Sequence, residues 1–361
     1  MAVNKNLTSK VERAIRTTDA LASAHVMPGP DGLRTLLRAA AKKGVSRGIL
    51  AAAERAVDEF EHFIRRELGD RDMLDAIISE SLPQARQRFE LSNKQAVYKA
   101  MGNLKGVVAN VHLRTYLIHP GADPERFDYA MILGLLGLRR VRPSAVVRLT
   151  NVHMQQMPRD DTRLTLDSEP VEALRGLELA QFCALPPPKI EVRHIGTSVD
   201  YVITGDAIGP DSAVDLVLAE LDRAFFCRYQ PENRRRAAAF AEVEQPAKLL
   251  VFDLLLHDDV WPDCRPEFCV YDTIVRGAAD INDPTRFGDR LDMAESIQFL
   301  GRGLARFRAI EVPNYLEMIG HVCNKLGWNP DSFRGYRVAI QYPLYGSQAC
   351  MIFDAPPRPG G

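Results

Sequence analysis

The sequence predicts an α+β protein with a helical N-terminal part and a C-terminal domain built on a mainly antiparallel sheet. Apolar residues recur at helical spacing in roughly the first hundred positions, whereas runs that alternate apolar and polar residues gather after three consecutive prolines at 186–188. The predicted strands cluster instead of alternating strictly with helices. This arrangement favours antiparallel pairing over a doubly wound sheet.

Length and composition indicate a multidomain globular protein. A chain of 361 residues suggests two or three domains, and 46% hydrophobic with 26% charged residues is ordinary. The net charge of −1 provides no overall attraction for nucleic acid, so such binding needs a local patch. We find no apolar run of membrane-spanning length and no signal-peptide core, and we expect a cytoplasmic protein without a membrane partner. The six cysteines are scattered, which predicts reduced thiols.

Residues 1–70 are expected to form helices that support the neighbouring segment or mediate dimerisation. Helical spacing covers residues 7–25 and 33–43, and prolines and glycines at 27–32 separate the two. Ser46 is a favourable N-cap for a long helix that reaches Leu68.

The most informative stretch lies between Pro83 and Pro120. Residues 83–89 predict a short helix, residues 92–105 a second one that ends at Gly106, and residues 107–118 an extended strand. On the second helix one face is apolar, with Ala96, Val97, Ala100, Met101 and Leu104. We expect that face to be buried and the polar face to be exposed. The polar face suits a DNA major groove because Gln and Asn contact base edges and Lys reaches phosphates.

The run from Leu91 to Lys105 resembles the recognition helix of winged helix-turn-helix transcriptional regulators, with Ser92, Val97, Met101 and Leu104 in similar roles. The resemblance implies a winged helix-turn-helix at 71–120, in which residues 73–79 are the first core helix and the strand after Gly106 is the wing. It also implies double-stranded DNA as partner and a homodimer that reads two half-sites. The implied DNA-binding residues are Arg86, Arg88, Ser92, Lys94, Gln95, Tyr98, Lys99, Asn103 and Lys105.

Residues 121–185 are expected to be a helical connector that ends at the prolines. Residues 127–138 are apolar on nearly all sides, which predicts a buried helix or an oligomer interface. A strand is expected at 145–149 and a further helix at 171–182.

Residues 189–355 are expected to form the C-terminal α+β domain, an effector or assembly domain. A hairpin is predicted around Gly196 from residues 189–194 and 199–204. Further strands are expected at 248–256, 267–275, 336–342 and 349–353. Helices are expected at 211–227, 289–307 and 312–326.

These observations favour a DNA-binding regulator whose C-terminal domain senses a small-molecule effector or mediates assembly, without a cofactor or a metal. Catalytic residues are not assigned. One alternative is an enzyme centred on the C-terminal domain, with His257, Asp258 and Asp259 as the first residues to test, although their spacing from Cys264 and Cys269 matches no common zinc pattern. The other is a non-enzymatic assembly protein that uses residues 127–138 as its interface.

Overall fold

The computed structural model describes residues 5–142, 145, 147–153, 163–170, 176–184, 189–195, 198–204, 208–210, 213–232 and 235–358. The chain forms two compact units, unit 1 at Met1–Asn93 and unit 2 at Lys94–Gly361. An N-terminal helical part and a C-terminal mixed sheet confirm the α+β class. The predicted segments 71–120 and 121–185 do not appear as separate bodies. The prolines at 186–188 lie outside the described residues.

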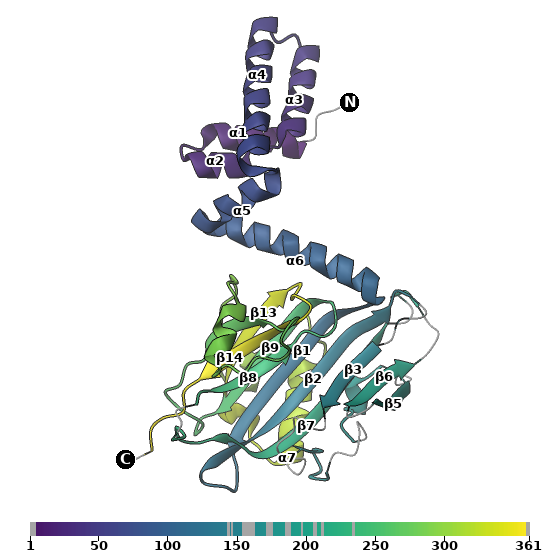
Figure 1. Cartoon of the computed structure of the whole chain (residues 1–361). Coiled ribbons are helices and arrows are strands. Elements are labelled where there is room, and N and C mark those ends of the chain that lie inside the picture. Colours follow the sequence, from purple (N-terminus) through teal and green to yellow (C-terminus); the bar gives the residue numbers. More distant parts are fainter. Residues whose placement is uncertain are drawn as a thin grey trace. The chain divides into compact units, whose positions relative to one another are not determined.

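Unit 1 consists of helices (Figure 1): α1 (Lys5–Arg16), α2 (Ala20–Val26), α3 (Pro30–Lys42), α4 (Arg47–Phe63) with the π-helical turn η1 (Ile64–Leu68), and α5 (Arg71–Ser81). The helix expected at 7–25 is interrupted because the Asp19 carboxylate accepts from the Ala22 amide at 2.7 Å and starts α2. Ser46 caps α4 as predicted. The apolar core of this unit includes Ile64, Leu74, Ile78 and Ala85.

One unbroken helix, α6 (Pro83–Lys105), replaces the two helices expected for a helix-turn-helix. Between Pro83 and Gly102 the chain has neither glycine nor proline, so no residue stops the helix. Arg86 and Glu90 form an i,i+4 ion pair at 2.8 Å across the expected turn. Ser92 is therefore an interior residue of the helix, and the two-helix prediction is wrong. Gly106, with φ +74°, ends α6 as predicted.

The strand expected to be a wing, β1 (Val107–Pro120), lies inside a seven-stranded sheet instead. The strand order is β12 (Gln298–Arg302), β13 (Phe333–Gln341), β9 (Ala247–His257), β1, β2 (Arg126–Arg140), β7 (Val214–Cys227) and β4 (Arg163–Leu164). Strands β1 and β9 are parallel, and the other pairs are antiparallel, so the sheet is mixed.

Two layers cover this sheet (Figure 1). On one face α7 (Tyr315–Leu326) packs against Leu113 and Leu117 of β1. On the other face, Tyr116 and Ile118 pack against a four-stranded sheet of β11 (Arg290–Leu291), β10 (Glu267–Asp272), β14 (Ser347–Phe353) and β8 (Ala237–Glu242). Strands β3 (Val147–His153), β6 (Ser198–Thr204) and β5 (Lys189–Ile195) form a third sheet. The antiparallel pairing of β5 with β6 confirms the two strands of the predicted hairpin, whose turn at Gly196 lies outside the described residues.

Two segments predicted to be helices are strands. Residues 127–138 lie in β2, which pairs with β1 on one edge and β7 on the other, and residues 214–227 form β7. A strand that is buried on both faces reads as a continuous apolar run without alternation, and that pattern resembles a buried helix. Because β2 lies within the sheet, the prediction that this run forms an oligomer interface is wrong.

The remaining predictions of strands and helices are partly confirmed and partly wrong. The four further strands and the helix at 312–326 are confirmed by β9, β10, β13, β14 and α7. The helix predicted at 289–307 is wrong, since this segment holds β11, β12 and the short 3-10 helix η5 (Leu304–Phe307). Of the helix predicted at 171–182, residues 171–175 lie outside the described residues, and the rest forms a turn and η2 (Ala180–Phe182). Among the described residues, no helix has both the length and the apolar character to traverse a bilayer.

A buried polar network joins three strands to α7. The fully buried Asp253 carboxylate accepts from Arg337 Nε at 2.8 Å and Nη2 at 2.7 Å, and from the Tyr315 hydroxyl at 2.6 Å. Tyr315 and Thr115 share a further hydrogen bond at 2.7 Å. The remaining Arg337 donors reach the carbonyl oxygens of Phe307 and Arg308, both at 2.8 Å. The network is therefore internally satisfied and positions η5 beside the sheet.

His112 on β1 should make the free energy of unfolding of unit 2 depend on pH below about 6.5. Burial, with the Arg114 charge as a second cause, lowers the pKa of His112 to about 3. The unfolded chain takes up this proton near the ordinary value of 6.5, so the free energy of unfolding falls as pH drops from 6.5 toward 3. We expect His112→Leu to reduce that slope by about 1.4 kcal/mol per pH unit.

Urea titrations between pH 7 and pH 4 check this expectation through tryptophan fluorescence, since both tryptophans, Trp261 and Trp328, lie in unit 2. Leu250→Val is the matched control because Leu250 faces His112 in the β1–β9 register. The control should lower stability at every pH and leave the slope intact. Equal slopes in the parent and His112→Leu would contradict the assignment.

Candidate anion-binding pocket

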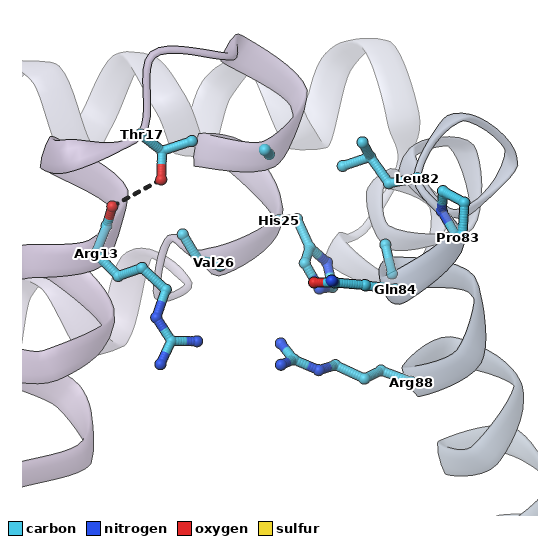
Figure 2. Close-up of a pocket in the computed structure, with 10 residues that line it drawn as sticks. Arg13, Thr17, His25, Val26, Leu82, Pro83, Gln84 and Arg88 are labelled. Carbon is cyan, nitrogen blue, oxygen red and sulfur yellow. Dashed lines mark hydrogen bonds between the residues drawn. The ribbon is translucent and has the colours of Figure 1, made fainter.

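Unit 1 contains a pocket of about 480 Å³ between α1, α2 and the first turns of α6. Figure 2 shows its walls, with Arg13 and Thr17 on one side and Leu82, Pro83 and Arg88 on the other. Its lining residues are Arg13, Thr17, Ala22, His25, Val26, Leu82, Pro83, Gln84, Ala85 and Arg88. This volume lies within the range of about 300–1,000 Å³ that is usual for small-molecule sites.

Two guanidinium groups face this pocket. In Figure 2 the side chains of Arg13 and Arg88 extend toward each other from opposite walls. Neighbouring arginines have carboxylate partners, for example Arg16 with Glu12 at 2.6 Å. In the described part of the chain, neither Arg13 nor Arg88 has an ion pair. Like charges that face one pocket repel each other, so an anion between them would be attracted to both.

The imidazole of His25 forms part of the pocket wall. Both ring nitrogens are buried and have no hydrogen-bond partner among the described residues. Burial lowers the pKa of His25, and the Arg88 charge lowers it further, so the neutral imidazole is favoured. The lining therefore offers one buried donor and one buried acceptor that a ligand can satisfy.

The N-terminus of α6 adds backbone donors to the same wall. Pro83 opens the helix, as the sequence predicts, and the amides of the first turn have no intrahelical acceptor. The preceding residue, Leu82, has no side-chain oxygen to accept from them. Gln84 and Ala85, which belong to this first turn, line the pocket with the two arginines, so the positive end of a 23-residue helix forms part of the same wall.

The residues predicted to bind DNA are divided between solvent and the interior. Lys94 is only 5% exposed and forms an ion pair with Glu295. The Tyr98 ring packs on Tyr342 with centroids 5.3 Å apart, and Lys105 Nζ donates to the Tyr345 hydroxyl at 2.9 Å. Gln95 is half-buried and Arg86 is paired with Glu90, whereas the exposed members of the set are Arg88, Ser92, Lys99 and Asn103.

The predicted orientation of this helical segment is reversed. Its apolar face is exposed, with Val97 at 37% and Leu104 at 70%, whereas Lys94 and Tyr98 on the polar face contact Glu295 and Tyr342 within unit 2. The polar face of α6 therefore does not form the exposed, groove-facing surface that was predicted, because Lys94 at its beginning is buried.

The residues of the enzyme hypothesis do not form a metal site. The Asp258 carboxylate accepts from Arg302 Nε at 2.9 Å, and His257 Nδ1 accepts from the Asp259 amide at 3.2 Å. Within the described ranges, no group of three or more His, Cys, Asp or Glu residues could hold a metal ion. Cys264 and Cys269 are free thiols.

Sequence reasoning missed Arg13, His25 and Gln84, because only the packing of α1, α2 and α6 brings them together. A signal was present in Arg13 and Arg88, which lack an acidic residue at i±4 on their helices. Comparison with known proteins returns no match: no family model, no curated protein and no solved structure is similar to this chain.

Proposed function

We propose that the protein is a binding protein whose unit 1 takes up a small organic anion, a carboxylate or a phosphate ester. The observation that supports this proposal is a pair of guanidinium groups, those of Arg13 and Arg88, on opposite walls of one pocket and without an ion pair among the residues that the structure describes. Arginine forks match the geometry of both anions and form charge-assisted hydrogen bonds with them. A bound anion removes the repulsion between the two cations.

The lining favours an anion that carries an apolar group. Val26, Leu82 and Pro83 provide apolar surface beside the cations, and the volume exceeds what a bare inorganic ion fills. We therefore expect phenyl phosphate to bind more tightly than inorganic phosphate, because its ring can bury apolar area against these side chains.

Removing either arginine should weaken binding. For Arg13→Ala and Arg88→Ala we expect the Kd of phenyl phosphate to rise about tenfold each, as lost charge-assisted hydrogen bonds predict. Isothermal titration calorimetry at low salt measures these constants. Proton NMR of the His25 ring should show its lowered pKa rising when the ligand binds, because a nearby anion stabilises the imidazolium.

Arg16→Ala is the matched control, because Arg16 lies on α1 like Arg13 but is paired with Glu12 and does not line the pocket. It should bind phenyl phosphate like the parent. If millimolar phenyl phosphate leaves the His25 resonances unmoved, or if Arg13→Ala with Arg88→Ala binds like the parent, the pocket is not an anion site.

Binding of double-stranded DNA is a second proposal, supported only by the exposed Arg88, Ser92, Lys99 and Asn103. With Lys94, Tyr98 and Lys105 engaged within unit 2, these exposed residues would have to hold the duplex through phosphate contacts. In that case the small anion is the effector of a regulator, and its pocket lies in unit 1 instead of the C-terminal domain.

A further inference from the structure

Two cysteines face each other across neighbouring strands of unit 2. Cys269 on β10 and Cys350 on β14 are direct partners in antiparallel register. Both belong to the same apolar cluster, with Tyr271, Ala279 and Ile281, so their side chains lie on one face of the sheet. Direct partners in such a pair have Cα atoms about 4.5–5.5 Å apart, and disulfides need about 4.4–6.8 Å. The register therefore places the two Cα atoms in the range of separations that a disulfide needs.

The two thiols differ in reactivity. A hydrogen bond with the Cys350 thiol lowers the pKa of Cys269; burial opposes this shift, and the Arg290 charge adds to it. The same interaction and burial raise the pKa of Cys350. Cys269 is half-buried, whereas Cys350 is fully buried. The thiolate, which is the reactive form, is therefore favoured on the more accessible sulfur of the pair.

We propose that Cys269 and Cys350 form a reversible cross-strand disulfide by exchange with a small-molecule disulfide such as oxidised glutathione. The Cys269 thiolate attacks one glutathione sulfur, and a mixed disulfide forms as one glutathione thiolate leaves. Cys350 then loses its proton and attacks the Cys269 sulfur, which expels the second glutathione. The protein loses two hydrogens, and one oxidised glutathione becomes two reduced ones.

The test uses the full chain, equilibrated in glutathione buffers of increasing oxidised fraction, quenched with acid and alkylated with iodoacetamide. Peptide mapping should show one cross-linked peptide that joins Cys269 to Cys350, and dithiothreitol should release it. A glutathione adduct that persists on Cys269, alkylation of both cysteines under oxidising conditions, or a different cysteine pairing would each overturn the proposal. Because this measurement needs no variant, it does not depend on how substitutions affect folding.

Variants separate the two roles. Cys350→Ser should retain a stable glutathione adduct on Cys269, since the resolving thiol is gone, whereas Cys269→Ser should form neither adduct nor cross-link. Cys264→Ser is the control, because burial raises the pKa of Cys264 and it has no cross-strand thiol among the described residues. It should form the Cys269–Cys350 cross-link like the parent. An equal adduct on Cys350 in the Cys269→Ser variant would contradict the assignment of the attacking sulfur.

Discussion

Arg337→Ala should lower the free energy of unfolding of unit 2 by about 3–5 kcal/mol, the usual cost of leaving one member of a buried ion pair without its partner. Asp253 is fully buried, and Arg337 provides two of its three hydrogen bonds from side chains. The substitution also leaves the carbonyl oxygens of Phe307 and Arg308 without these donors. Urea unfolding followed by tryptophan fluorescence measures the loss.

The control is Arg302→Ala. Arg302 lies on β12, next to the β13 strand of Arg337, and forms an exposed ion pair with Asp258. Exposed pairs contribute little, so its unfolding midpoint should match that of the parent. A combined Arg337→Met, Asp253→Leu variant should recover much of the loss, because it removes both charges and keeps apolar volume. If Arg337→Ala unfolds like Arg302→Ala, the network is not buried as described.

Lys94→Ala should cost about 2–4 kcal/mol of the stability of unit 2, close to the usual penalty for breaking a buried pair. The side chain of Glu295 is 16% exposed in the parent protein, and the substitution removes its lysine partner. Glu295 Oε2 already has no hydrogen-bond partner among the described residues. Because the Glu295 side chain keeps some contact with solvent, the expected loss is smaller than the largest penalties for breaking a fully buried pair. The same fluorescence titration provides the measurement.

Lys99→Ala is the matched control on the same helix, since Lys99 is exposed. It should leave the unfolding midpoint unchanged. Its effect on duplex DNA also tests the second proposal: at low salt it should weaken binding if α6 contacts phosphates. A parent protein that ignores duplex DNA at low salt would end that proposal, and equal destabilisation by both lysine variants would contradict the burial of Lys94.

The local signals in this chain were strong enough to predict several elements and their ends. Ser46, Pro83 and Gly106 mark helix ends as capping chemistry requires, and period-2 alternation located the hairpin strands β5 and β6. These features depend on neighbouring residues alone, so a single sequence contains them.

Features that depend on distant partners were not predictable in the same way. The helical spacing within α6 separates two faces, but the side that is buried depends on Glu295, Tyr342 and Tyr345, which are about 200 or more residues away. These partners are polar or aromatic, so Lys94 and Tyr98 face inward and Leu104 faces outward. For β2 the missing information was its two neighbouring strands, which pair both of its edges, and the two layers that cover the faces of the sheet.

The parallel alignment of β1 with β9 has a consequence for synthesis of the chain. Hairpin β1–β2 can form soon after residue 140 leaves the ribosome, but Ala109 must wait for Ala247 before its other edge is paired. Until then an apolar strand presents free backbone amides and carbonyls to any similar strand nearby. Nascent or truncated chains that end before β9 should therefore aggregate more readily than the folded protein.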